Sequence, residues 1–267
     1  MLTSDIPKLI DIVTQAARKE LLPRFTHVTH DIKNDGSIVT EADIATQQSL
    51  SNSLLHTWPN TRFLGEEMSA EEQLNILKSD SPVWCLDPLD GTSNFAAGIP
   101  YFAVSLSLIR QGEVILGLVF DPIRDELFLA EKLNSTLSVT FNQQVLKINS
   151  TRNSLDKSMA IIDFKRLDKN LASRLATDQP FASQRNFGAS ALDWCWLALS
   201  RGHLYLHGKQ NLWDYAAGEM IFKAAGGYAC TLNGEKIYQK SLEKRSVVAA
   251  VNEKLFNDWR AWINQKN

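Results

Sequence analysis

The stretch VWCLDPLDGTSNF, residues 83–95, joins an apolar run to a group of polar residues. The run over residues 83–86 is typical of a buried strand, and two carboxylates, Asp87 and Asp90, follow it at once. Crowded carboxylates repel one another and resist burial unless a cation lies between them. Because Gly91, Thr92 and Ser93 add hydroxyl and backbone oxygens, the stretch predicts a site for a hard cation such as magnesium at the end of a strand.

Three more acidic residues stand at the boundaries of expected elements. Asp43 lies in the first turn of a helix that is expected to begin after Thr40. Glu66 follows a short strand over residues 62–64, and Asp214 opens a helix in WDYAAG. Asp43 or Asp214 alone is typical of a helix N-terminus, where a carboxylate interacts favourably with the exposed amides. The pair Asp87 and Asp90 needs another explanation, because a helix cap needs only one acid.

Composition excludes several classes of protein. The 267 residues are 44% hydrophobic and 22% charged, and 28 basic against 30 acidic residues give a net charge of −2. This balance favours neither a membrane nor direct nucleic-acid contact. The N-terminal residues have no basic region followed by an apolar block, and no window approaches the ~18 apolar residues of a membrane span. Three cysteines are too few for a disulfide framework, so we expect a soluble cytoplasmic protein.

The hydrophobic pattern divides the chain into two parts that are expected to form one compact unit. Residues 1–148 read as an α+β part that carries most of the acids, with helices over 6–22 and 40–58, an acidic exposed segment around Glu71 and Glu72, and a hairpin of strands 103–109 and 114–120. Residues 149–267 read as an α/β part that carries Asp214, with strands over 159–162, 203–206, 228–231 and 246–251 and helices over 168–177, 190–200, 214–225 and 253–263. Trp194 and Trp196 are expected in the core or at a dimer interface.

The acidic blocks occur in a recognisable order. They read Asp43, Glu66-Glu67, Asp87-Pro88-Leu89-Asp90-Gly91-Thr92 and Trp213-Asp214-Tyr215-Ala216, and Gly188-Ala189-Ser190-Ala191-Leu192-Asp193 adds a fifth block. In this order the chain resembles the inositol monophosphatase family, within the lithium-sensitive, magnesium-dependent phosphomonoesterase superfamily. The resemblance implies a layered αβαβα sandwich of the inositol monophosphatase and fructose-1,6-bisphosphatase type. It also implies a homodimer.

The resemblance assigns roles to these residues. It implies one magnesium ion on Glu66, Asp87 and the carbonyl of Leu89, a second on Asp87, Asp90 and Asp214, and a third, weaker ion held through Glu66 and water. Catalysis is expected from Glu66, Thr92 and Asp90: Thr92 and Glu66 would orient a water for direct in-line attack on phosphorus, and Asp90 would also contact the substrate. Substrate contacts are expected from Asp90, Gly91, Thr92, Ser93, Gly188, Ser190, His207 and Asp214, with Asp43 and Glu67 behind them. The loop with Lys33 and Asp35-Gly36-Ser37 is a further candidate near the third ion.

One position departs from the family pattern. Relatives that act on inositol phosphates carry a glutamate seven residues before the WD aspartate, where it binds ring hydroxyls. Here His207 stands seven residues before Asp214. An imidazole does not replace a carboxylate that accepts two hydrogen bonds, so the preferred alcohol stays open. His203 and His207 are four residues apart in a strand-like pattern, which does not favour a zinc site.

The sequence therefore predicts a magnesium-dependent phosphomonoesterase of small phosphorylated metabolites, with inositol 1-phosphate as the default substrate. A 3′(2′),5′-bisphosphate nucleotidase, a fructose-1,6-bisphosphatase and a histidinol phosphatase are alternatives with the same chemistry. No basic cluster for a second phosphate is evident in the sequence. A regulatory protein that binds the transcription machinery is the alternative from another class. The complete acid set argues for the enzyme, since a scaffold has no need of it.

Overall fold

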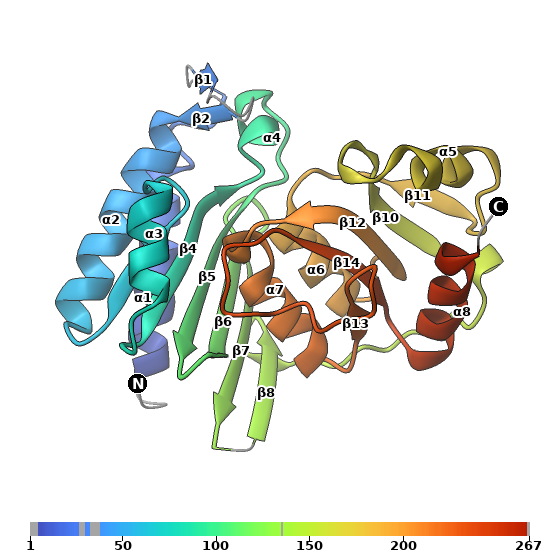
Figure 1. Cartoon of the computed structure of the whole chain (residues 1–267). Helices are drawn as coiled ribbons and strands as arrows, with labels where there is room; N and C mark the ends of the chain where they lie inside the picture. The colour runs from blue at the N-terminus through green and yellow to red at the C-terminus, as the bar shows by residue number, and fades with distance from the viewer. Residues whose placement is uncertain (1–4, 27–29, 33–37, 135, 266–267) are drawn as a thin grey trace.

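The structure is a computed structural model, and it describes residues 5–26, 30–32, 38–134 and 136–265. Its elements form five layers, helix on sheet on helix on sheet on helix (Figure 1). The expected αβαβα sandwich is confirmed. The loop with Lys33 and Asp35-Gly36-Ser37 lies outside the described residues.

The first sheet has seven strands in the order β3-β4-β5-β6-β7-β8-β9. Their bounds are β3 Arg62–Gly65, β4 Val83–Asp90, β5 Ala103–Arg110, β6 Glu113–Asp121, β7 Glu126–Leu133, β8 Thr136–Phe141 and β9 Gln144–Val145. β3 and β4 are parallel, and the other pairs are antiparallel. The predicted β5–β6 hairpin turns at Gln111 and Gly112, which both have positive φ, as a tight two-residue hairpin turn requires.

The second sheet is mixed and has the order β11-β10-β12-β14-β13. Its strands are β10 Met159–Asp163, β11 Ser183–Arg185, β12 Leu204–Gln210, β13 Tyr228–Cys230 and β14 Arg245–Ala250. β10 runs parallel to β11 and β12, and β14 runs antiparallel to β12 and β13. In the β10–β12 register Asp163 lies beside His207, so two polar side chains meet where β10 ends.

Two helices fill the space between the sheets, α6 Ser190–Ala198 and α7 Leu212–Ala224. Most of their residues are buried, as expected for helices that pack between two sheets. One apolar cluster includes Phe128 of the first sheet, Tyr215 of α7 and Leu206 of the second sheet. The two sheets therefore share a core through the central helices.

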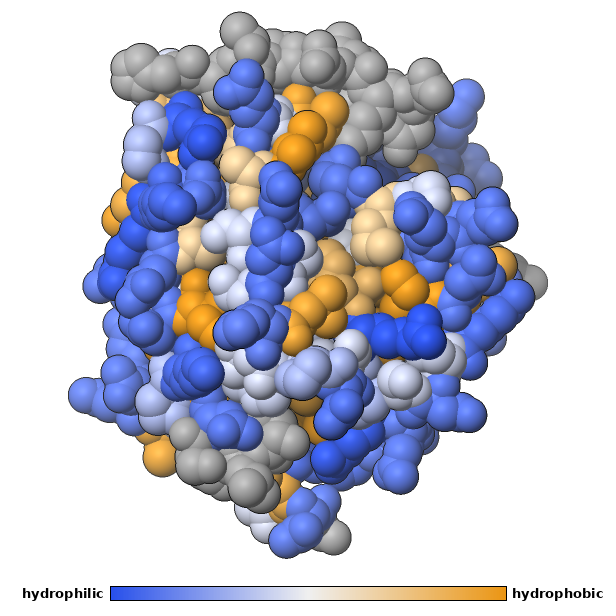
Figure 2. Space-filling view, turned by 90° about the vertical axis from the view of Figure 1, so that its left-hand side faces the viewer, coloured by the Kyte–Doolittle hydropathy of each residue, from blue (hydrophilic) through white to orange (hydrophobic). Residues whose placement is uncertain are grey.

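The outer helices are α1 Ile6–Glu20, α2 Glu41–Thr57 and α3 Ala70–Leu77 beside the first sheet, and α5 Lys169–Thr177 and α8 Glu253–Asn264 beside the second. Figure 2 shows the side of the molecule that carries the first layer, where apolar patches are separated by hydrophilic surface. Ile44, Leu55 and Leu74 are exposed on α2 and α3. No helix within the described residues is long and apolar enough to cross a bilayer.

The segment around Glu71 and Glu72 is exposed, as expected, and it forms the first turn of helix α3, which was not expected. Ser69 caps the helix and Glu72 reaches back to the Ser69 amide at 3.0 Å, a reciprocal capping box. The acids thus stabilise a helix N-terminus. The remaining short elements are β1 His30–Ile32, β2 Ile38–Thr40, α4 Thr92–Ala96, and the 3-10 turns η2 Leu155–Lys157 and η3 Phe164–Arg166.

Candidate active site

The motif of residues 83–95 forms the end of β4 and the start of α4. The β4–β5 register shifts between Asp87 and Asp90, and such a bulge re-aims the side chains of a strand. Gly91 follows with φ of 92°, and a Cβ there would lie 2.9 Å from the carbonyl oxygen of Tyr101. Both the backbone conformation and the space require glycine. The chain can therefore turn directly from two carboxylates into the helix that begins at Thr92.

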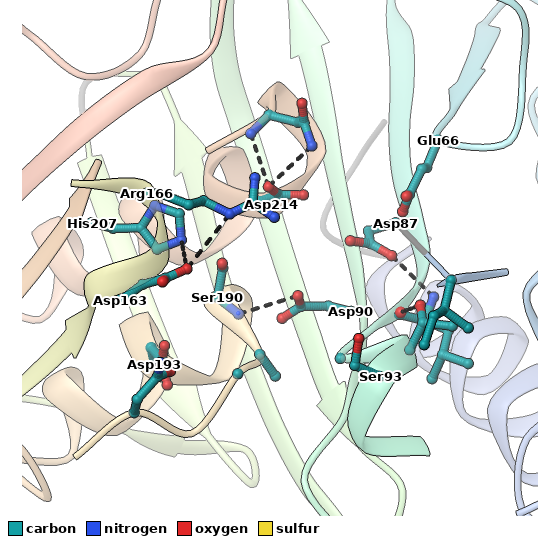
Figure 3. A pocket seen from close by; sticks show the side chains of 18 of the residues that line it. Glu66, Asp87, Asp90, Ser93, Asp163, Arg166, Ser190, Asp193, His207 and Asp214 are labelled. Carbon is teal, nitrogen blue, oxygen red and sulfur yellow. Dashed lines mark hydrogen bonds and ion pairs between the residues drawn. The ribbon is translucent and has the colours of Figure 1, made fainter. Parts of the chain in front are cut away.

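These residues line a cleft of about 190 Å³ between the two sheets (Figure 3). It brings together every residue that was predicted to bind metal or substrate, namely Glu66, Asp87, Leu89, Asp90, Gly91, Thr92, Ser93, Gly188, Ser190, His207 and Asp214. Glu66 and Asp87 lie at one end, Asp163 and His207 lie at the other, and Asp90 and Asp214 lie between them.

Neighbouring elements hold the acidic side chains in place. Asp90 accepts hydrogen bonds from the amides of Ser190 at 3.1 Å and Ala191 at 2.6 Å, so it caps α6. Asp214 accepts from the Asn211 amide at 2.8 Å, and Asp87 accepts from the Leu89 amide at 3.0 Å.

Helix α3, which the sequence did not reveal, holds the chain at Glu66. The Gln73 side chain donates to the carbonyls of Gly65 at 2.8 Å and Glu66 at 3.2 Å.

Although the acids line one cleft, no three His, Cys, Asp or Glu side chains of the described chain are gathered closely enough to hold an ion as they stand.

Burial and mutual repulsion dominate the electrostatics of the acidic end. Burial raises the pKa of Asp87 well above its usual value, and the charges of Glu66, Asp90 and Asp214 raise it further. The pKa of Asp90 is also well above normal, because of burial first and the Asp214 charge next. Among the described residues, no basic side chain pairs with Asp87 or Asp90. Buried, repelling, all-oxygen ligands suit a hard divalent cation, so the residues present fit magnesium.

Asp43 and Thr92 form a connected pair beside this end. One Asp43 oxygen accepts from the amide and hydroxyl of Thr40, at 2.7 and 2.6 Å, which confirms the predicted start of α2. The Thr92 hydroxyl lies 3.0 Å from the other Asp43 oxygen and 2.9 Å from the Leu89 carbonyl. Asp43 thus orients Thr92 from behind. Glu67 lies further away, and its amide donates to the Gln47 side chain at 3.1 Å.

The opposite end of the cleft is organised by Asp163. His207 Nε2 lies 3.1 Å from Asp163 Oδ2, and His207 Nδ1 accepts from the Lys209 amide at 3.2 Å. An Nδ1 that accepts carries no proton, so we assign a neutral imidazole with its proton on Nε2. Both nitrogens of His207 are therefore used within the protein. The Arg166 Nε lies 3.5 Å from the same Asp163 oxygen (Figure 3).

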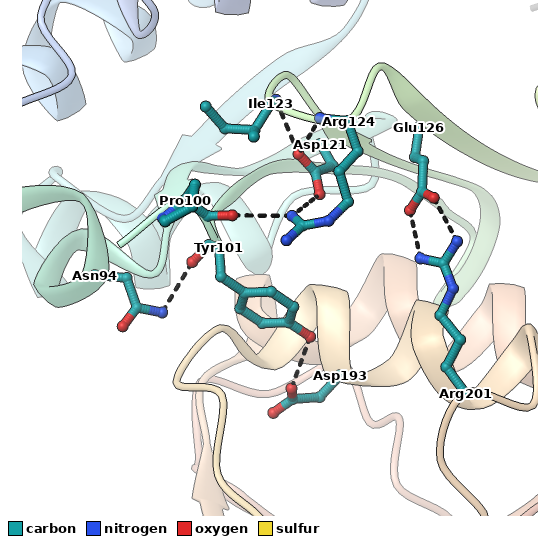
Figure 4. A network of polar contacts seen from close by, with 9 residues as sticks. All are labelled: Asn94, Pro100, Tyr101, Asp121, Ile123, Arg124, Glu126, Asp193 and Arg201. Atoms are coloured by element: carbon teal, nitrogen blue, oxygen red, sulfur yellow. Dashed lines mark hydrogen bonds and ion pairs between the residues drawn. The ribbon is translucent and has the colours of Figure 1, made fainter. Parts of the chain in front are cut away.

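Sequence reasoning missed several residues that line this end: Asp163, Arg166, Asn186, Asp193 and Lys244. Asp163 carries a recognisable signal, because it ends a buried apolar run in the same way as Asp87. Arg166 lies in the short 3-10 turn η3, and Lys244 lies in the irregular segment before β14. Neither position has a hydrophobic pattern that would predict its place in the fold. Asp193 lies 3.1 Å from the Tyr101 hydroxyl (Figure 4), and burial raises its pKa to about 8.

The histidine pair does not form a zinc site. His203 Nδ1 accepts from the Met159 amide at 3.0 Å, whereas His207 contacts Asp163. The two side chains therefore have different partners. The strand-like pattern around them is confirmed by β12.

Comparison with known proteins agrees with the fold. Residues 4–264 match the inositol monophosphatase family, and the chain belongs to this family of phosphatases. It is 33% identical to inositol monophosphatase 1 of Solanum lycopersicum over 233 residues, which covers 83% of this chain and 84% of that one. It is 30% identical to the Nus factor SuhB of Pasteurella multocida over 243 residues, covering 87% and 88%. The crystal structure of the extragenic suppressor protein SuhB from Bartonella henselae superposes with a TM-score of 0.85 at 25% identity, covering 99% of this chain and 100% of that one.

Proposed function

We propose that the protein is a magnesium-dependent phosphomonoesterase that hydrolyses a small phosphorylated metabolite. One observation carries the proposal: Glu66 after β3, Asp87 and Asp90 of β4, and Asp214 of α7 line a single cleft beside Gly91, Thr92 and Ser93. The carboxylates raise one another's pKa there, an arrangement that costs stability and is therefore expected to serve a bound cation.

The residues divide into two sets of metal ligands. Glu66, Asp87 and the Leu89 carbonyl would hold one ion, and Asp87, Asp90 and Asp214 a second. Magnesium in these positions would neutralise charge on the phosphoryl and leaving oxygens and make a nearby water easier to deprotonate. The amides of Gly91, Thr92 and Ser93 would bind the phosphate, while Thr92 and Glu66 orient the water in line with the leaving oxygen. Asp43 supports this geometry, because it holds the Thr92 hydroxyl.

Inositol 1-phosphate remains the default substrate of this proposal, because the family and the tomato relative carry that name. A bisphosphate nucleotidase or a fructose-1,6-bisphosphatase would use the same acidic end. The other end of the cleft must decide between them, since it is the part that faces the alcohol.

Assay of a panel of phosphomonoesters with magnesium tests the proposal. The variant Asp90→Asn should abolish turnover and leave the protein folded, because an asparagine can still cap α6. Asp168→Asn is the matched control. Asp168 caps α5 in the same way, at 3.0 and 3.1 Å from the amides of Asn170 and Leu171, and it does not line the cleft. Full activity of Asp90→Asn, or no hydrolysis of any ester by the parent protein, would contradict the proposal.

We further propose a homodimer that forms around Trp196. Trp196 is partly exposed, packs against Tyr101 and Phe187, and has the guanidinium groups of Arg124 and Arg201 over its ring at 5.3 and 5.0 Å. Arg and aromatic side chains are enriched at protein interfaces. Light scattering should give twice the chain mass of 30.0 kDa, and a monomer at micromolar concentration would contradict the dimer.

Three smaller proposals accompany the main one. Lithium should inhibit by occupying the second ion's position, and inhibition that is unchanged in Asp214→Asn would contradict this.

Residues 1–148 and 149–267 should unfold in one transition, because one apolar cluster contains side chains from both sheets. The cytoplasm is the proposed location, since Cys85, Cys195 and Cys230 are all free and buried.

A second candidate function is a role in transcription. Relatives at 30% identity are named Nus factor SuhB, and they match this chain over 87% of its length. Binding of the purified protein to purified RNA polymerase tests this role. Binding that persists in Asp90→Asn would show a function separate from hydrolysis, and the absence of binding would exclude it.

A further inference from the structure

The end of the cleft opposite the acids has a charge of its own. Arg166, from η3, lies beside Asp163 at this end, and Lys244, from the segment that precedes β14, lines the same cleft; both are exposed. The two residues are far apart in the sequence, so no basic cluster is visible there. The fold brings them to the same cavity, and this revises the expectation that the site offers no cations for a second anionic group.

The charges at this end do not cancel. Asp163 is opposed by Arg166 at 3.5 Å and receives a hydrogen bond from the neutral imidazole of His207. Burial raises the pKa of Asp193 to about 8, which favours its neutral form at pH 7. Within the described chain, Lys244 has no ion-pair partner. Lys244 is therefore a cation of the cleft lining that no described carboxylate neutralises.

Hydrogen-bonding groups at this end are poorly placed for a neutral polyol. A polyol needs free acceptors for its hydroxyls, as the family glutamate supplies. Here His207 uses both its nitrogens within the protein. Asp163 Oδ1 accepts from the Lys165 amide at 2.9 Å, and Oδ2 faces both His207 and Arg166. The acceptors of His207 and Asp163 are thus used within the protein, whereas the donors of Arg166 and Lys244 remain.

The free donors belong to the two cations. Arg166 contacts Asp163 through Nε, and its two terminal nitrogens make no hydrogen bond to any described residue. Those nitrogens form a planar fork that matches a carboxylate or a phosphate. Because Asp163 holds the guanidinium by one edge, less side-chain freedom is lost when an anion binds the other edge.

We propose that this end of the cleft is a subsite for a second anionic group, a carboxylate or a phosphate, on the alcohol part of the substrate, bound by Arg166 and Lys244. The proposal rests on the phosphatase function above, because it concerns the part of the same substrate that leaves. It predicts that the preferred esters carry at least one negative charge besides the phosphate that is hydrolysed.

Matched pairs of esters test the subsite and separate its two possible ligands. 3-Phosphoglycerate and glycerol 3-phosphate differ only in a carboxylate, and fructose 1,6-bisphosphate and fructose 1-phosphate differ only in the second phosphate. In at least one pair, kcat/KM should be about tenfold higher for the more anionic ester. The preference should decrease as salt increases, because both cations are exposed.

Variants locate the effect. Arg166→Gln and Lys244→Gln should each lower kcat/KM by about three- to tenfold for the ester with the additional anionic group. The kcat/KM for the matched ester with an uncharged alcohol part should stay the same. Lys209→Gln is the matched control, since Lys209 is an exposed lysine on β12 that does not line the cleft. Equal loss in Lys209→Gln would show a general field of positive charge and would overturn a specific subsite.

The outcomes for the subsite and for the phosphatase are distinct. Hydrolysis at equal efficiency in both pairs would overturn the subsite and leave the phosphatase proposal intact. If no ester is hydrolysed, the phosphatase proposal fails. Calorimetric binding of the same pairs then decides the subsite: tighter binding of the anionic esters that is lost in Arg166→Gln supports it, and equal affinities overturn it.

Discussion

The two ends of the cleft differ in burial and in charge. At one end, Asp87 and Asp90 are 2% and 7% exposed and repel each other. At the other end, the exposed Arg166 lies beside the contact between His207 and Asp163, and the exposed Lys244 lines the same cleft. The carboxylates of the acidic end are therefore held in a buried environment that suits a bound cation, whereas the cations of the cleft contact solvent. We infer that the first end determines the chemistry and the second determines which alcohol is accepted.

The largest effect is expected at the acidic end. Asp87→Asn should lower kcat by at least about 10³-fold, because it removes a carboxylate proposed to contact both ions. In metal-free solution the same variant should be more stable by about 1 kcal/mol, since it relieves the repulsion from Glu66, Asp90 and Asp214. Enzyme assays and urea unfolding measure the two quantities.

Asp121→Asn is the control for Asp87→Asn. Asp121 also ends a strand of the first sheet and is fully buried, but it accepts from the Ile123 and Arg124 amides and pairs with the Arg124 side chain at 2.8 Å (Figure 4). The Arg124 guanidinium already neutralises this carboxylate, so Asp121→Asn should lower the free energy of unfolding of the protein. If both variants lose stability alike, repulsion does not destabilise the acidic end, and the proposed difference between Asp87 and Asp121 is wrong.

Magnesium should change how stability depends on pH. The raised pKa values of Asp87, Asp90 and Asp214 mean that the folded, metal-free protein holds protons that the unfolded chain releases. Its stability should therefore decrease as pH rises above the ordinary carboxyl pKa of about 4. Magnesium at about 100 times its Kd should restore ~2.7 kcal/mol at neutral pH. Thermal unfolding at pH 5 and 8, with magnesium or with EDTA, tests this; a magnesium effect of equal size at both pH values would contradict it.

The sequence predicted the acidic end almost completely, for a physical reason. Asp87 and Asp90 belong to one buried strand of eight residues. Glu66 and Asp214 each stand at an element boundary that periodicity locates. The basic end depends on tertiary structure. Asp163 and His207 meet only through the register of β10 and β12, and Lys244 reaches the cleft through an irregular segment. Helix α3 was missed although Ser69 and Glu72 stand at the spacing of a capping box, because only Gln73 and Leu77 of this helix are buried and its apolar pattern is weak.

A smaller effect is expected at Asp193, beside the basic end. Its pKa of about 8 means that the proton it holds when folded is lost as pH rises, so its contribution to stability decreases between about pH 4 and 8. Asp193→Asn keeps the site neutral and should increase stability at pH 9 by about 2 kcal/mol while changing little at pH 5. Urea unfolding at both pH values measures this. Asp178→Asn, at an exposed carboxylate, serves as the control and should show no such difference.

The smallest effect is expected at His207, although the family pattern gives that position a role in binding the alcohol. Because both imidazole nitrogens are used by Asp163 and Lys209, His207→Gln should change kcat/KM for neutral esters by less than about threefold. His203→Gln is the matched control, since His203 also accepts a backbone hydrogen bond but lies outside the cleft lining. A loss above tenfold in His207→Gln alone, with KM raised and kcat unchanged, would mean that the imidazole contacts the substrate. The basic end would then bind hydroxyls through His207 as well as anions through Arg166. The two kinds of recognition would lie on either side of Asp163, which contacts both residues.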